Sequence, residues 1–103
     1  MARLIWTEPA LLDLDEIAEY IALDNPSAAS RYAQRVFDRV AKLEQFPKSG
    51  KRPKELHGSV YREIVVSPCR IFYRIEEEKI YIIYLMRAEQ LLRIFLLKQR
   101  DKI

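Results

Sequence analysis

The sequence predicts one α+β domain, residues 1–103, in which an antiparallel helical hairpin packs on an antiparallel β-meander sheet. Three observations predict this class. The first half holds two stretches of helical periodicity, and the second half holds three β-rich runs joined by short polar breaks. The chain has 103 residues, of which 50% are apolar, so it can bury one modest core but not two.

A short strand opens the domain and leads into the first helix. Residues 3–6 form an apolar run that is typical of a strand. Thr7 is a good N-cap, and Pro9 after it is tolerated in a first helical turn. Apolar residues then recur at helical spacing with acidic residues between them, which predicts an amphipathic helix that ends near Leu23.

A second helix follows after a short break, so we expect the two helices to pair antiparallel. Asn25 and Pro26 supply the cap and the first helical position, and apolar residues trace one face as far as Phe46. The other side of this helix carries four cations at helical spacing, which we interpret as a solvated stripe: Arg31, Arg35, Arg39 and Lys42.

Residues 60–66, 69–75 and 79–86 are rich in β-branched and aromatic residues and predict a three-stranded meander, with the opening strand added to the sheet. The alternation of the middle strand puts Cys69, Ile71, Tyr73 and Ile75 on one face and Arg70, Phe72 and Arg74 on the other. We expect the first face to be core and the second to be a polar face available to a partner.

The tail, residues 88–100, fits either a helix or a strand by its composition, and a helix is preferred. It is almost wholly apolar from residue 91 to residue 97. A segment this apolar has to be covered by the domain or by a partner.

Positive charge is concentrated in the middle of the chain. The total of 18 Lys and Arg against 15 Asp and Glu gives a net charge of only +3, too little by itself to indicate nucleic acid. Residues 42–74, however, hold 8 basic and 3 acidic residues, and four of the cations lie in one loop bounded by Pro and Gly: Lys48, Lys51, Arg52 and Lys54. This segment is the candidate binding surface.

The residue types present exclude several kinds of site. One His and one Cys do not make a protein-built metal site, two glycines do not make a phosphate loop, and no cofactor is expected. His57 has no evident Ser or Cys partner and is interpreted as a surface residue. A single Cys69 without a signal-peptide or membrane-span pattern predicts a cytoplasmic protein without membrane contact.

Two kinds of chemistry suit the arginines. Metal-free RNA cleavage needs cations around the phosphate and two proton carriers, and the tyrosines of the strands are expected to pack by their rings instead. Binding to an acidic protein surface needs arginine forks beside an apolar strip, which the sequence also offers. No arrangement typical of a DNA-recognition helix is visible.

The order of these pieces resembles the RelE/ParE superfamily of bacterial type II toxins, also called plasmid stabilisation proteins. The stretches that carry the resemblance run from Leu4 to Arg87: LIWTEPALLDLDEIAEYIA, NPSAASRYAQRVFDRVAKLEQFPKSGKRP and VYREIVVSPCRIFYRIEEEKIYIIYLMR. The resemblance implies the same strand, hairpin and sheet. It also implies a cognate ParD-like antitoxin whose flexible segment folds on binding.

Two branches of the superfamily share this fold, so the fold cannot separate them. RelE-like members cut messenger RNA in the ribosomal A site, whereas ParE-like members act on DNA gyrase and are not nucleases. Many ribonuclease-type relatives have a histidine near the end of the last meander strand, where this chain reads YLMRAE over residues 84–89. The missing histidine and the long apolar and basic tail favour the ParE branch and a toxin without enzymatic activity.

The resemblance then suggests site residues for each activity. For gyrase binding they are Arg52, Lys54, Arg62, Arg70, Arg74, Arg87, Arg93 and Lys98. For a ribonuclease they are Arg70, Arg74 and Arg87, and for the antitoxin they are Leu14, Ile17, Ile21, Arg62 and Arg70. An inactive member kept as an antitoxin partner is a third interpretation. A homodimer and a hetero-oligomer with the antitoxin both remain open.

Overall fold

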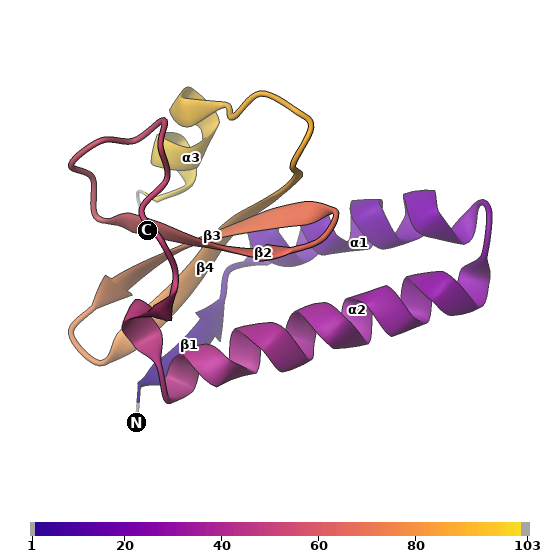
Figure 1. Ribbon diagram of the computed structural model, residues 1–103, viewed down its shortest axis with the longest axis horizontal. Coiled ribbons are helices and arrows are strands. Elements are labelled where there is room, and N and C mark those ends of the chain that lie inside the picture. Colours follow the sequence, from indigo (N-terminus) through magenta and orange to yellow (C-terminus); the bar gives the residue numbers. More distant parts are fainter. Residues whose placement is uncertain (1, 102–103) are drawn as a thin grey trace.

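The computed structural model describes residues 2–101 and contains a four-stranded sheet with helices on both faces (Figure 1). The elements in chain order are β1 (Arg3–Trp6), α1 (Glu8–Ala22), α2 (Pro26–Ala41), β2 (Tyr61–Val66), β3 (Cys69–Glu76), β4 (Lys79–Arg87) and α3 (Ile94–Arg100). Two 3₁₀-helical turns, Lys42–Glu44 and Pro47–Ser49, follow α2. The predicted α+β class, the helical hairpin and the meander are confirmed.

Local capping chemistry starts both long helices where the sequence predicted. The Thr7 hydroxyl accepts from the Ala10 amide at 3.4 Å and donates to the Ile82 carbonyl at 2.7 Å, so the cap also ties α1 to β4. The Asn25 side chain accepts from the Ala28 amide at 3.2 Å. The second helix ends earlier than predicted, at Ala41, because the chain tightens into 3₁₀ turns before Pro47.

The strands lie in the order β1-β4-β3-β2, with β1 parallel to β4 and the meander antiparallel. The two-residue connection between β2 and β3 pairs Val66 with Cys69, and this register places Arg62 opposite Tyr73. A bulge between β3 and β4 inserts Ile83 into the alternation of β4. As a result Ile82 faces the helical hairpin, while Ile83 and Tyr84 both join the cluster on the opposite face.

Each face of the sheet carries its own core. The face covered by α1 and α2 buries a large cluster around Val36, Val40, Leu43, Ile71 and Ile82, all of them 0% exposed. The opposite face, called here the outer face, buries a second cluster under the loop of residues 51–60 and under α3: Leu56, Tyr61, Phe72, Ile83, Tyr84, Met86 and Leu97. Figure 1 shows this loop and α3 lying close together, away from the hairpin.

The prediction of an open, polar outer face is therefore wrong. Phe72 is 0% exposed because Leu97 of α3 and Leu56 of the loop pack over it. The tail is helical as preferred, but α3 begins at Ile94 and not at Ala88. Residues 88–93 instead form a turn and an extended stretch, held at its start by the Ala88 amide, which donates to the Pro68 carbonyl at 2.8 Å. Among the described residues, the helices are too short and too polar to cross a membrane.

Gly50 occupies a point where the fold leaves no room for a side chain. Its amide donates to the Tyr73 hydroxyl at 2.9 Å, and a Cβ there would lie 2.5 Å from that oxygen and 2.8 Å from the Glu63 carbonyl. We expect Gly50→Ala to lower the free energy of unfolding by about 1–3 kcal/mol through overpacking, as measured by urea denaturation. The control Ser49→Ala changes the exposed neighbour and should stay within about 0.5 kcal/mol of wild type. Equal stabilities of the two variants would contradict the steric argument.

Candidate functional site

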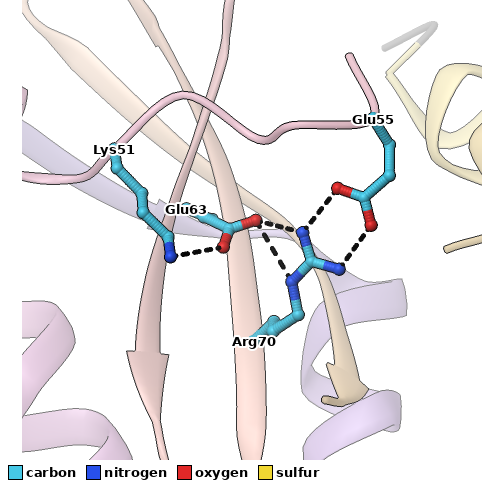
Figure 2. A network of polar contacts seen from close by, with 4 residues as sticks. All are labelled: Lys51, Glu55, Glu63 and Arg70. Atoms are coloured by element: carbon cyan, nitrogen blue, oxygen red, sulfur yellow. Dashed lines mark hydrogen bonds and ion pairs between the residues drawn. The ribbon is translucent and has the colours of Figure 1, made fainter. Parts of the chain in front are cut away.

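Arg70 on β3 is held between two carboxylates on the outer face (Figure 2). Its Nη1 and Nη2 donate to the two oxygens of Glu55 at 2.7 and 2.9 Å, and its Nε donates to Glu63 Oε2 at 3.1 Å. Its Nη2 also donates to Glu63, and Lys51 Nζ lies 3.7 Å from the other Glu63 oxygen. These four side chains connect the 51–60 loop to β2 and β3. The charge of Arg70 is thus compensated within the chain.

The pairing with Arg70 lowers the pKa of Glu55. Hydrogen bonding from Arg70 lowers the pKa of Glu55 from 4.5 to about 2, against a smaller opposing effect of burial. A carboxyl whose pKa is depressed in the folded state stabilises the fold above the unfolded-state pKa, and that contribution is lost as the pH falls through the folded-state pKa. The contribution of Glu55 is therefore complete above pH 4.5 and disappears between pH 4.5 and about pH 2.

We expect Glu55→Gln to change the acid sensitivity of the protein accordingly. The difference in Tm between wild type and the variant should be largest above pH 4.5 and should shrink towards zero as the pH falls to about 2. Thermal unfolding followed by circular dichroism from pH 2 to pH 7 measures this difference. A difference that stayed constant over this range would contradict the charge pairing of Glu55 with Arg70.

Arg74, two residues further along β3, is also paired with carboxylates. Its Nε lies 2.7 Å from Asp101 Oδ1, and its Nη1 lies 2.8 Å from Glu76 Oε2. The Tyr61 hydroxyl donates to the second oxygen of Asp101 at 2.7 Å. Burial, with a further contribution from Asp101, raises the pKa of Tyr61 to about 12, so this phenol is a poor proton acceptor at neutral pH.

Arg62 and Arg87 lie on the other face of the sheet. In the strand register Arg62 lies opposite Tyr73 and Arg87 lies opposite Cys69. Tyr73 and Cys69 both belong to the core under the hairpin, so the two arginines share that face. Arg62 donates to the Gly50 carbonyl at 2.8 Å, while Arg87 lies 2.8 Å from Glu89 and stacks over the Tyr20 ring at 4.8 Å. The four arginines predicted for gyrase binding therefore do not share one face of the sheet, because the register sends Arg70 and Arg74 to one side and Arg62 and Arg87 to the other.

The other predicted target-binding residues lie in two exposed places. Arg52 and Lys54 are on the 51–60 loop, where Arg52 donates to the Ser59 carbonyl at 2.5 Å and Lys54 is exposed. Arg93 and Lys98 are exposed on the C-terminal segment. They lie in the same segment as two of the most exposed apolar side chains, Leu91 at 92% and Phe95 at 81%. This combination of cations and apolar side chains is typical of a protein-binding surface.

A groove of about 900 Å³ lies between α1, the end of β4 and residues 90–100. Its apolar lining comes mainly from α1 and from the C-terminal segment: Ile17, Tyr20, Leu91, Leu92 and Leu96. At one end Asp13 accepts from Arg100 at 2.5 and 2.9 Å and from the Leu85 amide at 3.0 Å, which joins α1, α3 and β4. Asp13 and Arg100 stand 87 positions apart, so no local sequence signal indicated this pairing.

The residues predicted to contact an antitoxin are divided by this arrangement. Leu14 is 4% exposed and belongs to the core, so it offers no surface. Ile17 and Ile21 are half-buried at the edge of the same core, and Ile17 lines the groove. His57 is exposed on the loop, and within residues 2–101 no group of three His, Cys, Asp or Glu side chains is arranged to hold a metal ion.

Comparison with known proteins gives concordant matches. The model of the family described as "ParE toxin of type II toxin-antitoxin system, parDE" matches residues 4–92. The chain is 40% identical over 90 residues to the Y4kP protein of Sinorhizobium fredii, covering 85% of this chain and 90% of that protein. It is 33% identical over 92 residues to toxin RelE2 of Caulobacter vibrioides, covering 88% of this chain and 100% of that protein.

A solved structure shares the fold as well. It is described as the chromosomal ParDE TA system from P. aeruginosa, and the matched chain superposes with a TM-score of 0.73 at 30% sequence identity. The match covers 86% of this chain and 98% of that one.

Proposed function

The chain belongs to the family of ParE toxins of type II toxin-antitoxin systems, and on this premise we propose that it arrests growth by binding DNA gyrase and stabilising its complexes with cleaved DNA. Gyrase lies in the cytoplasm, so this is the proposed site of action. The toxin would act by binding and not by chemistry of its own.

The positions of the candidate catalytic arginines carry this proposal. Cleavage of a phosphodiester would require cations that converge on one phosphate and groups that transfer protons. Arg70 and Arg74 are neutralised by carboxylates on the outer face, and Arg87 lies on the opposite face beside Glu89. This separation favours binding over ribonuclease activity.

We propose the C-terminal segment as part of the gyrase-binding surface. Leu91 and Phe95 expose apolar area without cover from the described chain, and Arg93 and Lys98 add charge in the same segment. The variant Phe95→Ala/Lys98→Gln should weaken gyrase inhibition about tenfold or more, which corresponds to about 1.4 kcal/mol of binding free energy. Its Tm should stay close to that of wild type because both side chains are exposed.

A supercoiling assay run beside a ribosomal messenger-cleavage assay tests the proposed function. We expect micromolar protein to block supercoiling by gyrase and to accumulate cleaved plasmid, while the messenger stays intact. Unchanged supercoiling together with turnover of messenger at the ribosome would establish the alternative. That alternative, a ribosome-dependent endonuclease, is favoured by the 33% identity to a protein named RelE2.

We also propose a ParD-like antitoxin as the neutralising partner, forming a hetero-oligomer with the toxin. The similarity to a chain from a ParDE system and the groove beside Ile17 support this partner. Arg62 and Arg70 lie on opposite faces of the sheet, so a partner that contacts both has to pass around the edge formed by β2. Ile17→Asp should reduce antitoxin affinity more than Glu19→Gln, the exposed control on the same helix, as measured by calorimetry.

A further inference from the structure

The cations of the protein differ in whether a carboxylate lies beside them. Four arginines on the outer face and beside the groove have carboxylate partners: Arg70, Arg74, Arg87 and Arg100. Within residues 2–101, six other cations on separate elements have no carboxylate oxygen within 4.0 Å: Arg3, Arg52, Lys54, Lys79, Arg93 and Lys98. A third group lies along α2, the turn after it and the first half of β2: Arg31, Arg35, Arg39, Lys42, Lys48 and Arg62. Among residues 2–101, none of these six has a carboxylate oxygen within 4.0 Å. We call this group the basic seam.

Three arginines of the seam are held in place by polar contacts that leave their charge intact: Arg31, Arg35 and Arg62. Arg31 donates to the Ser27 hydroxyl at 3.1 Å, and Arg35 donates to the Ser67 carbonyl at 3.1 Å. Arg62 donates to the carbonyls of Gly50 and Lys48 at 2.8 and 3.3 Å. These acceptors are neutral, so they orient the guanidinium groups without compensating their positive charge. The carboxylates that hold Arg70 and Arg74, in contrast, do compensate it.

The two halves of the seam meet at the contact between α2 and β2. The Tyr32 hydroxyl of α2 donates to the Val66 carbonyl of β2 at 2.6 Å, and Arg35 crosses to Ser67 just beyond it. At the other end of β2, burial raises the pKa of the Tyr73 hydroxyl, and the nearby positive charges of Arg62 and Arg39 both act against that rise. Gly50 joins Arg62 to this hydroxyl, because its carbonyl accepts from Arg62 at 2.8 Å and its amide donates to the Tyr73 hydroxyl at 2.9 Å.

Three cations of α2 and Lys42, which follows it directly, form a narrow stripe. At about 100° per residue, Arg31, Lys42, Arg35 and Arg39 fall within roughly 80° of the helix circumference. From residue 31 to residue 42 the helix rises about 16 Å, which matches about five base-pair steps along duplex DNA. A straight stripe of this length suits the regularly spaced charges of a phosphate backbone.

The surroundings of the stripe disfavour the other anionic partners. An acidic protein segment binds through apolar anchors as well as charge, yet the exposed aromatic side chains nearest in sequence do not lie on the stripe. Phe37, 39% exposed, points from another side of α2 towards Trp6, and Phe46 lines a hollow beside Lys48 with Ile75 and Glu77. Single-stranded nucleic acid requires exposed aromatic rings for stacking. Tyr32 is buried beneath Arg35, and Phe37 of the same helix packs edge-on against Trp6.

We propose that the basic seam binds the phosphate backbone of duplex DNA without reading its sequence. This inference builds on the proposed function, because a toxin bound to gyrase would then also hold the DNA that the enzyme has cleaved. Backbone contacts of this kind release counterions, so the affinity falls steeply with salt.

The test measures binding of the full chain to a fluorescent 20-base-pair duplex by anisotropy at 50–200 mM salt, without gyrase. With about four phosphates neutralised, log K should fall against log salt with a slope of about −4. Arg31→Gln/Arg35→Gln should reduce the magnitude of that slope by about 2. The charge-matched control Arg3→Gln/Lys79→Gln removes two exposed cations from β1 and β4 and should leave the slope unchanged.

Several results would overturn the inference. No duplex binding by wild type at 50 mM salt would do so, and so would an equal loss in the control pair, which would indicate diffuse net charge. Polyglutamate bound as tightly as the duplex, with the same loss in the seam variant, would assign the seam to an acidic protein partner. Gyrase is absent from this assay, so the two proposals can fail separately. Seam-dependent DNA binding by a protein that does not inhibit supercoiling would contradict the proposed function and support DNA binding by the seam.

Discussion

Arg70→Ala is expected to lower the free energy of unfolding by about 3–5 kcal/mol, because it leaves a buried carboxylate without its charged partner. The Glu63 side chain is 3% exposed, and the cation that remains, Lys51, is 3.7 Å away and 66% exposed. A mobile, solvated ammonium at that distance does not replace the guanidinium that contacts Glu63 through two nitrogens. Urea denaturation followed by circular dichroism measures the loss.

Arg74→Ala is the matched control, because Arg74 has the same residue type on the same strand and face. Its partners Asp101 and Glu76 are 15% and 57% exposed, so water can solvate them once the arginine is gone. We expect a loss of about 1–2 kcal/mol for this control. Similar losses for the two variants would contradict the argument that the burial of Glu63 makes Arg70 critical.

A double variant separates the cost of an unpaired charge from the worth of the pair. Replacing a buried ion pair by apolar residues of similar volume is often neutral or stabilising. Glu63→Leu/Arg70→Met should therefore be more stable than Arg70→Ala alone, although Glu55 and Lys51 lose their partner as well. A double variant less stable than the single one would show that the network contributes net stability.

Much of the fold followed from local chemistry in the sequence. Thr7 and Asn25 started the two helices as predicted, because an N-cap needs only its own side chain and the next three residues. The short connections between the strands fixed the meander for the same reason. Structural features that depend on a few neighbouring residues could therefore be predicted from the sequence alone.

The faces of the arginines also follow from the sequence when the side-chain alternation is counted along both strands of the hairpin. Because the Ser67-Pro68 connection pairs Val66 with Cys69, counting back along both strands places Arg62 opposite Tyr73. Tyr73 belongs to the predicted core face, so Arg62 shares that face. The register of the hairpin thus separates Arg62 from Arg70 and Arg74 although all three carry the same charge.

The cover of the outer face could not be predicted, because it depends on pairs that are distant in the sequence. Tyr61 and Asp101 are 40 positions apart, and Asp13 and Arg100 are 87 positions apart. The same contacts place α3 and create the groove. An apolar tail indicated that something had to be covered, and only the structure shows that the tail itself covers Phe72 and Ile83.

Leu97→Ala should lower the free energy of unfolding by about 2–5 kcal/mol, because Leu97 is the one fully buried side chain of α3 and fills the outer core. Leu91→Ala, with a side chain 92% exposed, is the matched control and should change stability by less than about 0.5 kcal/mol. A loss below about 1 kcal/mol for Leu97→Ala would mean that the outer core is not closed by α3 in solution.

Hydrogen exchange would show whether the damage of Leu97→Ala is local or global. The Asp101 amide donates to the Leu97 carbonyl at 3.2 Å within the last turn of α3, whereas Val40 lies in the core on the other side of the sheet. If α3 detaches while the rest stays folded, the Asp101 amide should lose protection in the variant and the Val40 amide should keep it. Because α3 forms one wall of the groove and carries Phe95, such a variant should also inhibit gyrase less at temperatures where its core remains folded. Full inhibition by a protein with a detached α3 would remove this helix from the proposed gyrase-binding surface.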